Sequence, residues 1–133
     1  MKRRLDALTR IGRLQALIHD VCRSRLHSLD RQQLQLDDDL KAVFDTMDAD
    51  EAVYGAHAGL VARRIRTLQL RLGQLAGEQE SARRSVLTQG TRAKLVELAI
   101  EAAALDDRRL NERKELVEII EHSVRRAASS KQD

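Results

Sequence analysis

Proline and tryptophan are absent from this chain of 133 residues, and cysteine, phenylalanine and tyrosine occur once each. With so few aromatic rings, the sequence lacks the bulky side chains that usually fill a compact globular core. The single cysteine, Cys22, excludes an internal disulfide and favours a reducing compartment. No stretch approaches the roughly 18 apolar residues of a membrane helix, and no apolar signal segment follows Met1. We therefore expect a cytoplasmic protein of one domain, without membrane insertion.

Charged residues are abundant, at 34 % of the chain, and unevenly distributed. Residues 34–52 carry seven acidic side chains and one lysine, whereas residues 53–94 carry eight basic and two acidic ones. A composition rich in charged residues, leucine and alanine is typical of long helices and coiled coils. The composition therefore predicts an all-α fold.

An apolar stripe with alternating steps of four and three residues organises the second half of the chain. Its positions are Tyr54, Ala58, Val61, Ile65, Leu68, Leu72, Leu75, Gln79, Ala82, Val86, Gln89, Ala93, Val96, Ile100 and Ala103. A stripe with a 3.5-residue period keeps one face of a supercoiled helix against a partner. We predict a coiled-coil helix at about residues 52–127 and a frayed tail at 128–133.

The first half of the chain predicts a shorter partner helix at about residues 3–47. Its apolar seam is expected at Ile11, Leu14, Ile18, Cys22, Leu26, Leu29, Gln33, Leu36, Leu40, Val43 and Met47. Two successive steps of four around Cys22 form a stutter that locally unwinds the supercoil, and Gly12 lies just off the seam. The acidic segment at residues 48–51 predicts the turn, with Asp48 or Asp50 capping the second helix.

So short a turn requires the two helices to run antiparallel, as a long two-helix coiled-coil hairpin. Counting outward from the turn pairs Phe44 with Tyr54, Gln33 with Ile65, Leu26 with Leu72, and Ile18 with Gln79. The second helix then continues unpartnered from residue 96 as a protruding C-terminal helix with an apolar patch. The alternative is a helix break at Gly90, which gives a three-helix bundle.

No motif in the sequence indicates an enzyme, and we expect no catalytic residue, cofactor or metal ion. Glu118 and His122 are one helical turn apart, but no further ligand type converges on them. Arginines on the second helix leave nucleic-acid binding as an alternative, at Arg63, Arg64, Arg66, Arg71, Arg83 and Arg84. This alternative is disfavoured because aromatic residues for base stacking are lacking.

The stretch Asn111-Glu112-Arg113-Lys114-Glu115-Leu116-Val117-Glu118-Ile119-Ile120 resembles the end of the second helix in the FliJ family of flagellar type III export proteins. The layout, a shorter first helix, an acidic turn and a longer second helix, is similar over nearly the whole chain. The injectisome stalk family of virulence secretion systems is related and would show the same features.

The resemblance implies a stalk that couples the export ATPase ring to the export gate. Its partners would be the ATPase ring, the export-gate membrane protein and empty export chaperones, with a location in the cytoplasm and peripherally at the inner membrane. The partner-binding residues expected on this basis are Arg113, Lys114, Leu116, Ile119 and Ile120. A generic coiled-coil adaptor or secretion chaperone is the alternative to this role.

Overall fold

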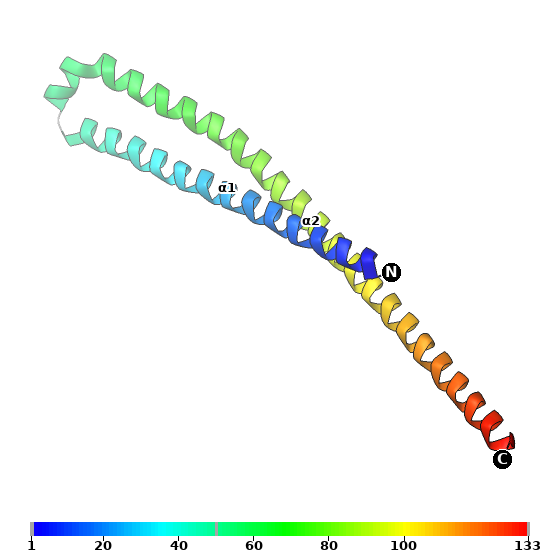
Figure 1. Cartoon of the computed structure of the whole chain (residues 1–133). Helices are drawn as coiled ribbons and strands as arrows, with labels where there is room; N and C mark the ends of the chain where they lie inside the picture. The colour runs from blue at the N-terminus through cyan, green and yellow to red at the C-terminus, as the bar shows by residue number, and fades with distance from the viewer. Residues whose placement is uncertain (1, 50, 133) are drawn as a thin grey trace. The chain divides into compact units, whose positions relative to one another are not determined.

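The computed structural model is all-helical over the residues that it describes, with two long helices that pack against each other (Figure 1). Its backbone is described for residues 2–49 and 51–132, and its side chains for residues 2–48 and 57–131. Helix α1 spans Lys2–Ala49 and helix α2 spans Glu51–Gln132. The chain forms two compact units, one of Leu17–Thr91 and one of Met1–Ala16 with Arg92–Asp133. The predicted all-α fold class is confirmed.

The unit of residues 17–91 has a narrow core of leucine and alanine. Leu75 is fully buried, and Leu29 and Ala82 form a cluster with it. Leu26 and Leu36 pack against this cluster. A row of buried or half-buried α1 residues recurs here in heptad steps, at His19, Cys22, Leu26, Leu29, Gln33, Leu36, Leu40, Val43 and Met47, and Ser28, Asp30 and Asp39 are half-buried beside it.

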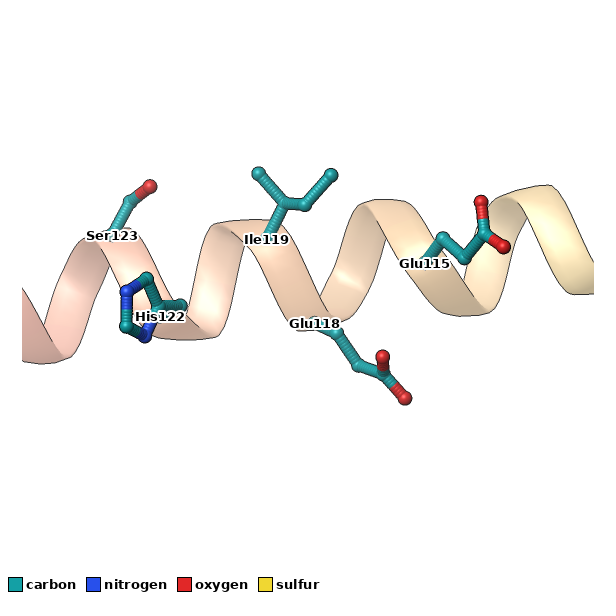
Figure 2. A pocket seen from close by; sticks show the side chains of 5 residues that line it. All are labelled: Glu115, Glu118, Ile119, His122 and Ser123. Carbon is teal, nitrogen blue, oxygen red and sulfur yellow. The ribbon is translucent and has the colours of Figure 1, made fainter.

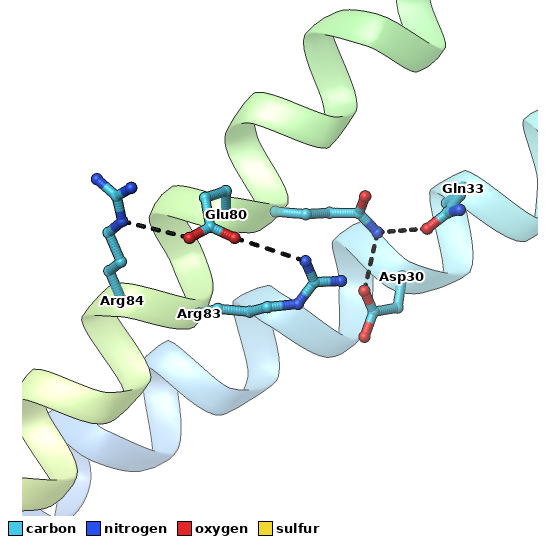
Figure 3. A network of polar contacts seen from close by, with 6 residues as sticks. Asp30, Gln33, Glu80, Arg83 and Arg84 are labelled. Atoms are coloured by element: carbon cyan, nitrogen blue, oxygen red, sulfur yellow. Dashed lines mark hydrogen bonds and ion pairs between the residues drawn. The ribbon is translucent and has the colours of Figure 1, made fainter.

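A buried glutamine interrupts this apolar core. Gln79 is only 4 % exposed, and its Nε2 donates hydrogen bonds to Asp30 Oδ1 at 2.9 Å and Gln33 Oε1 at 2.7 Å (Figure 3). A buried amide without such partners would destabilise the fold by about 1–3 kcal/mol. Sliding one helix along the other would break both bonds. Gln79 therefore favours a single axial register, as polar residues at coiled-coil core positions do.

In the unit of residues 1–16 and 92–133, α1 approaches α2 at a glycine. A Cβ built on Gly12 would lie 2.8 Å from Ile100 Cδ1 and 3.5 Å from Val96 Cγ1. Because glycine has no Cβ, the α1 backbone can come this close to the two side chains. Leu5 and Gln15 are half-buried at heptad spacing from Gly12. Gly12 thus lies on the contact face of α1, and its predicted position off the seam is wrong.

The predicted seam of α1 is confirmed from Cys22 onwards and is wrong before it. Ile11 and Leu14 are 50 % and 59 % exposed, and Ile18 is also exposed. The half-buried row runs instead through Gly12, Gln15 and His19. Since the step from His19 to Cys22 is three residues, the row keeps its heptad spacing and the predicted stutter does not occur.

The contact row of α1 carries Gly12, Gln15 and His19 in place of apolar residues, and the two helices approach each other closely there. A Cβ on Gly90 would lie 3.2 Å from His19 Nε2, so the imidazole occupies space that a larger residue at position 90 would fill. In the other unit, Ile100 occupies the space beside Gly12 in the same way. At both places a large side chain packs against a glycine, so steric complementarity favours this row of α1 as the contact surface. The sequence prediction had considered mainly the apolar character of the residues.

The predicted axial register between the helices is wrong by about four helical turns. Gln33 accepts a hydrogen bond from Gln79, although the prediction paired Gln33 with Ile65 and Gln79 with Ile18. The helix is also irregular near the start of α2, where His57 has non-helical torsion angles (φ −118°, ψ 16°).

Two further predictions concern the connection between the helices. One is the contact between Phe44 and Tyr54, which lies outside the described residues because the side chain of Tyr54 is not among them. Phe44 itself is 42 % exposed. The cap predicted at Asp50 also lies outside the described residues. The alternative helix break is wrong, because α2 is continuous through Gly90 and extends to Gln132, past the predicted end at residue 127.

Candidate partner-binding site

The last part of α2 is exposed along its whole described length. Every side chain from residue 108 to residue 131 is exposed, whereas Val96, Ile100 and Ala103 are half-buried. The exposed segment thus begins later than the predicted residue 96, as the shifted register requires. All five predicted partner-binding residues lie in it: Arg113, Lys114, Leu116, Ile119 and Ile120.

Six large apolar side chains form an exposed face on this segment, which we call the C-terminal face. Its members are Leu110, Leu116, Val117, Ile119, Ile120 and Val124, and they are between 37 % and 62 % exposed. Leu116, Ile119 and Ile120 are three and four residues apart, so they are neighbours on the helix surface. An apolar patch of several adjacent side chains on a soluble protein typically marks an interaction site.

The C-terminal face continues the face of α2 that packs on α1. Leu110, Val117 and Val124 follow Val96 and Ala103 at intervals of seven residues. Positions seven residues apart stay in line along a supercoiled helix. The sequence prediction counted these residues as part of the apolar patch but named only Leu116, Ile119 and Ile120 as apolar partner-binding residues. Extending the stripe beyond Ala103 would have added the heptad row.

Charged groups surround the C-terminal face. Arg113 lies one turn before Leu116 and Val117, within the apolar band, and Lys114 lies at its edge. On the other side, Glu115, Glu118, Ile119, His122 and Ser123 line a shallow depression on α2 (Figure 2). Among the described residues, no group of three acidic, histidine or cysteine side chains could hold a metal ion. Apolar side chains bordered by charged ones are a composition suited to contacts with another protein chain.

The arginines proposed for nucleic-acid binding are partly engaged by acidic residues of the same helix. Arg83 and Arg84 both pair with Glu80, at 3.8 Å and 3.3 Å (Figure 3), and Arg71 pairs with Glu78 at 3.3 Å. These pairs reduce the local positive charge that phosphate contacts need. Arg63, Arg64 and Arg66 are exposed. The arginines of α2 thus do not form a uniformly positive surface.

Three residues of the predicted α1 seam, Ile11, Leu14 and Ile18, are exposed, and so are the neighbouring Leu17 and Val21. The sequence signal was strong, but it was assigned to the wrong contact. Leucine and isoleucine at heptad spacing indicate a helical interface without specifying which helix provides the other side.

No family model, curated protein or solved structure matches the chain.

Neither helix contains, within its described residues, an apolar stretch sufficient to cross a lipid bilayer.

Proposed function

We propose that the chain is an antiparallel coiled-coil hairpin that acts as the non-enzymatic central stalk of a type III protein export apparatus. In this role the C-terminal face docks into the ring of the export ATPase. The hairpin then couples the ring to the export-gate membrane protein and escorts empty export chaperones. The observation that carries the proposal is the exposed apolar face on a single helix, from Leu110 to Val124.

Contacts within residues 17–91 support the hairpin. His19 lies beside Gly90, Asp30 binds Gln79, and the Gln32 amide oxygen accepts a hydrogen bond from Arg71 at 3.2 Å. Residue numbers thus rise along α1 while they fall along α2, which is the order expected of antiparallel helices. A polar core residue such as Gln79 is a known way to specify one register in a coiled coil.

The dimensions and chemistry of the exposed segment support docking into a ring. A lone helix is about 10–12 Å across with its side chains, and residues 108–131 span roughly 36 Å. Such an element enters a narrow protein pore more readily than a globular domain does. The apolar residues of the C-terminal face would supply the buried contacts, and Arg113 within the apolar band and Lys114 at its edge would supply charge contacts. The resemblance of residues 111–120 to the export stalk family points to the same end of the helix.

Binding to a purified hexameric export ATPase tests the proposal directly. The double variant Leu116→Asp/Ile120→Asp should abolish binding, because it places two charges in the centre of the apolar face. Arg113→Ala/Lys114→Ala should weaken binding less than the first double variant and make it less sensitive to salt, because exposed charges act mainly on the association rate. Binding is measured by titration of labelled chain at two salt concentrations.

A matched control is the double variant Leu70→Asp/Leu87→Asp. These leucines are 66 % and 71 % exposed on α2, outside the C-terminal face, so this variant should bind like the wild type. Circular dichroism should show unchanged thermal unfolding of the helical core for both double variants. Native affinity of Leu116→Asp/Ile120→Asp for the ring would contradict the proposed docking end. Capture of a different helical partner through the same face, without ring binding, would replace the stalk role by that of an adaptor.

A further inference from the structure

Two arginines lie among the apolar side chains at the start of the C-terminal face. Four residues follow one another here in steps of four, and their side chains form one ridge along α2: Leu105, Arg109, Arg113 and Val117. All four are exposed and belong to the unit of residues 1–16 and 92–133. The ridge thus begins and ends with an apolar side chain and carries two positive charges between them.

The neighbours of Arg113 on the helix surface are apolar or positively charged. The residues three and four positions away from it are Arg109, Leu110, Leu116 and Val117. Among the described residues, neither Arg109 nor Arg113 forms an ion pair. Two like charges four residues apart slightly destabilise a helix. An opposite charge supplied by a partner would therefore stabilise this arrangement.

Docking of the C-terminal face would remove Arg113 from water together with its apolar neighbours. Burying a guanidinium group without a partner is strongly unfavourable, because the lost hydration is not replaced. A carboxylate replaces it well, since the two planar groups can form two parallel hydrogen bonds with opposite charges. An entirely apolar groove would therefore disfavour this face, whereas a groove with one acidic side chain would fit it.

We propose that the surface which receives the C-terminal face is an apolar groove with an aspartate or glutamate side chain opposite Arg113. This inference rests on the proposed docking into the export ATPase ring, and it adds the chemistry by which a ring subunit recognises the helix. The carboxylate of the ring subunit pairs with Arg113 and offsets the repulsion between Arg109 and Arg113. The apolar side chains around Arg113 exclude water from this ion pair.

Replacing Arg113 by methionine tests the inference through the direction of the effect on binding. Arginine and methionine have similar helix propensities, so Arg113→Met removes the charge without weakening the helix. For the purified hexameric export ATPase, the dissociation constant of this variant should rise at least about 30-fold, mainly through faster dissociation, because the carboxylate is left buried and unpaired. In an entirely apolar groove, Arg113→Met would instead bind as tightly as the wild type or more tightly, since methionine extends the apolar face.

Lys114→Met is the matched control, because it removes the same charge from the adjacent position, at the edge of the apolar band. It should change the dissociation constant by less than about threefold, as expected of an exposed charge. Surface plasmon resonance gives both rate constants for each variant. Native or tighter binding of Arg113→Met, together with loss of binding in Leu116→Asp/Ile120→Asp, would overturn the inference and leave the docking end in place. Native affinity of Leu116→Asp/Ile120→Asp would contradict the docking itself, and the inference with it.

Discussion

Gln79 and Gln33 are joined by a side-chain hydrogen bond of 2.7 Å from Nε2 of Gln79 to Oε1 of Gln33, inside the core of residues 17–91. Asp30 accepts a second bond from the same nitrogen. Gln79 is the one strongly buried polar side chain among the described residues. The hydrogen bonds of Gln79 therefore stabilise the fold and also restrict the axial register of the two helices.

Replacing Gln79 by alanine should lower the free energy of unfolding by about 1–3 kcal/mol. The variant removes both hydrogen bonds and leaves the half-buried Asp30 and Gln33 without their donor. Urea unfolding followed by circular dichroism measures the change. Gln74→Ala is a matched control, because Gln74 is exposed on α2, and its effect should stay within about 0.5 kcal/mol. Equal effects of the two substitutions would mean that the buried bonds add nothing to stability.

The contact between Gly12 and Ile100 gives a second prediction, which depends on one methyl group. Alanine at position 12 improves helix propensity by about 1 kcal/mol, but its Cβ would come within 2.8 Å of Ile100 Cδ1. Gly12→Ala alone should therefore change stability little. In the background of Ile100→Val, which lacks Cδ1, the same change should stabilise the fold by about 0.5–1 kcal/mol.

Gly77→Ala is the reference for that experiment, because nothing lies within 4 Å of the added Cβ. It should stabilise the wild type and the Ile100→Val variant equally, by about 0.5–1 kcal/mol. A thermodynamic cycle from thermal unfolding gives the coupling energy. Zero coupling between positions 12 and 100 would contradict the close approach of α1 to α2 at this point.

These local contacts explain what the sequence could and could not predict. The heptad period of α2 predicted its helix and core, and Leu75 and Ala82 are buried as expected. The register was not predictable from the period, because a shift by whole heptads keeps apolar residues facing apolar residues. It depends on specific pairs such as His19 with Gly90 and Gln33 with Gln79. Neither pair has a strong signal in the sequence.

For the candidate site, patterns predicted which residues are apolar but not which of them are covered. Leu116, Ile119 and Ile120 were expected to be exposed and are so. Ile11 and Leu14 were expected to be covered and are exposed, although their spacing is as regular. Exposure depends on which row α1 presents to α2, and the glycine at position 12 allows α1 to approach Ile100 and Val96 closely on that row. A prediction based on apolar residues alone gives no weight to a glycine, although its lack of a side chain permits close packing of two helices.

Crosslinking tests the axial register of the proposed hairpin. In a Cys22→Ser background, the pair Gln33→Cys/Gln79→Cys should react with a short bismaleimide within one chain, because these two side chains are in contact. The pair Gln33→Cys/Ile65→Cys should react poorly, since the two positions are roughly four helical turns out of register. Gel mobility at low protein concentration separates products within one chain from products between chains. Efficient crosslinking of the second pair instead of the first would support the register that the sequence alone suggested.

Hydrogen exchange should distinguish the packed and unpacked parts of α2. Amides at residues 110–130 should exchange much faster than those at residues 65–90, because a helix without tertiary contacts is only marginally stable in water. Addition of the export ATPase ring should slow exchange at residues 110–130 and leave residues 65–90 unchanged, since the core around Leu75 is already protected. Leu116→Asp/Ile120→Asp should exchange like the free wild type whether or not the ring is present. Equal protection of the two segments in the free chain would mean that the C-terminal face is already covered, and would argue against its use as the docking surface.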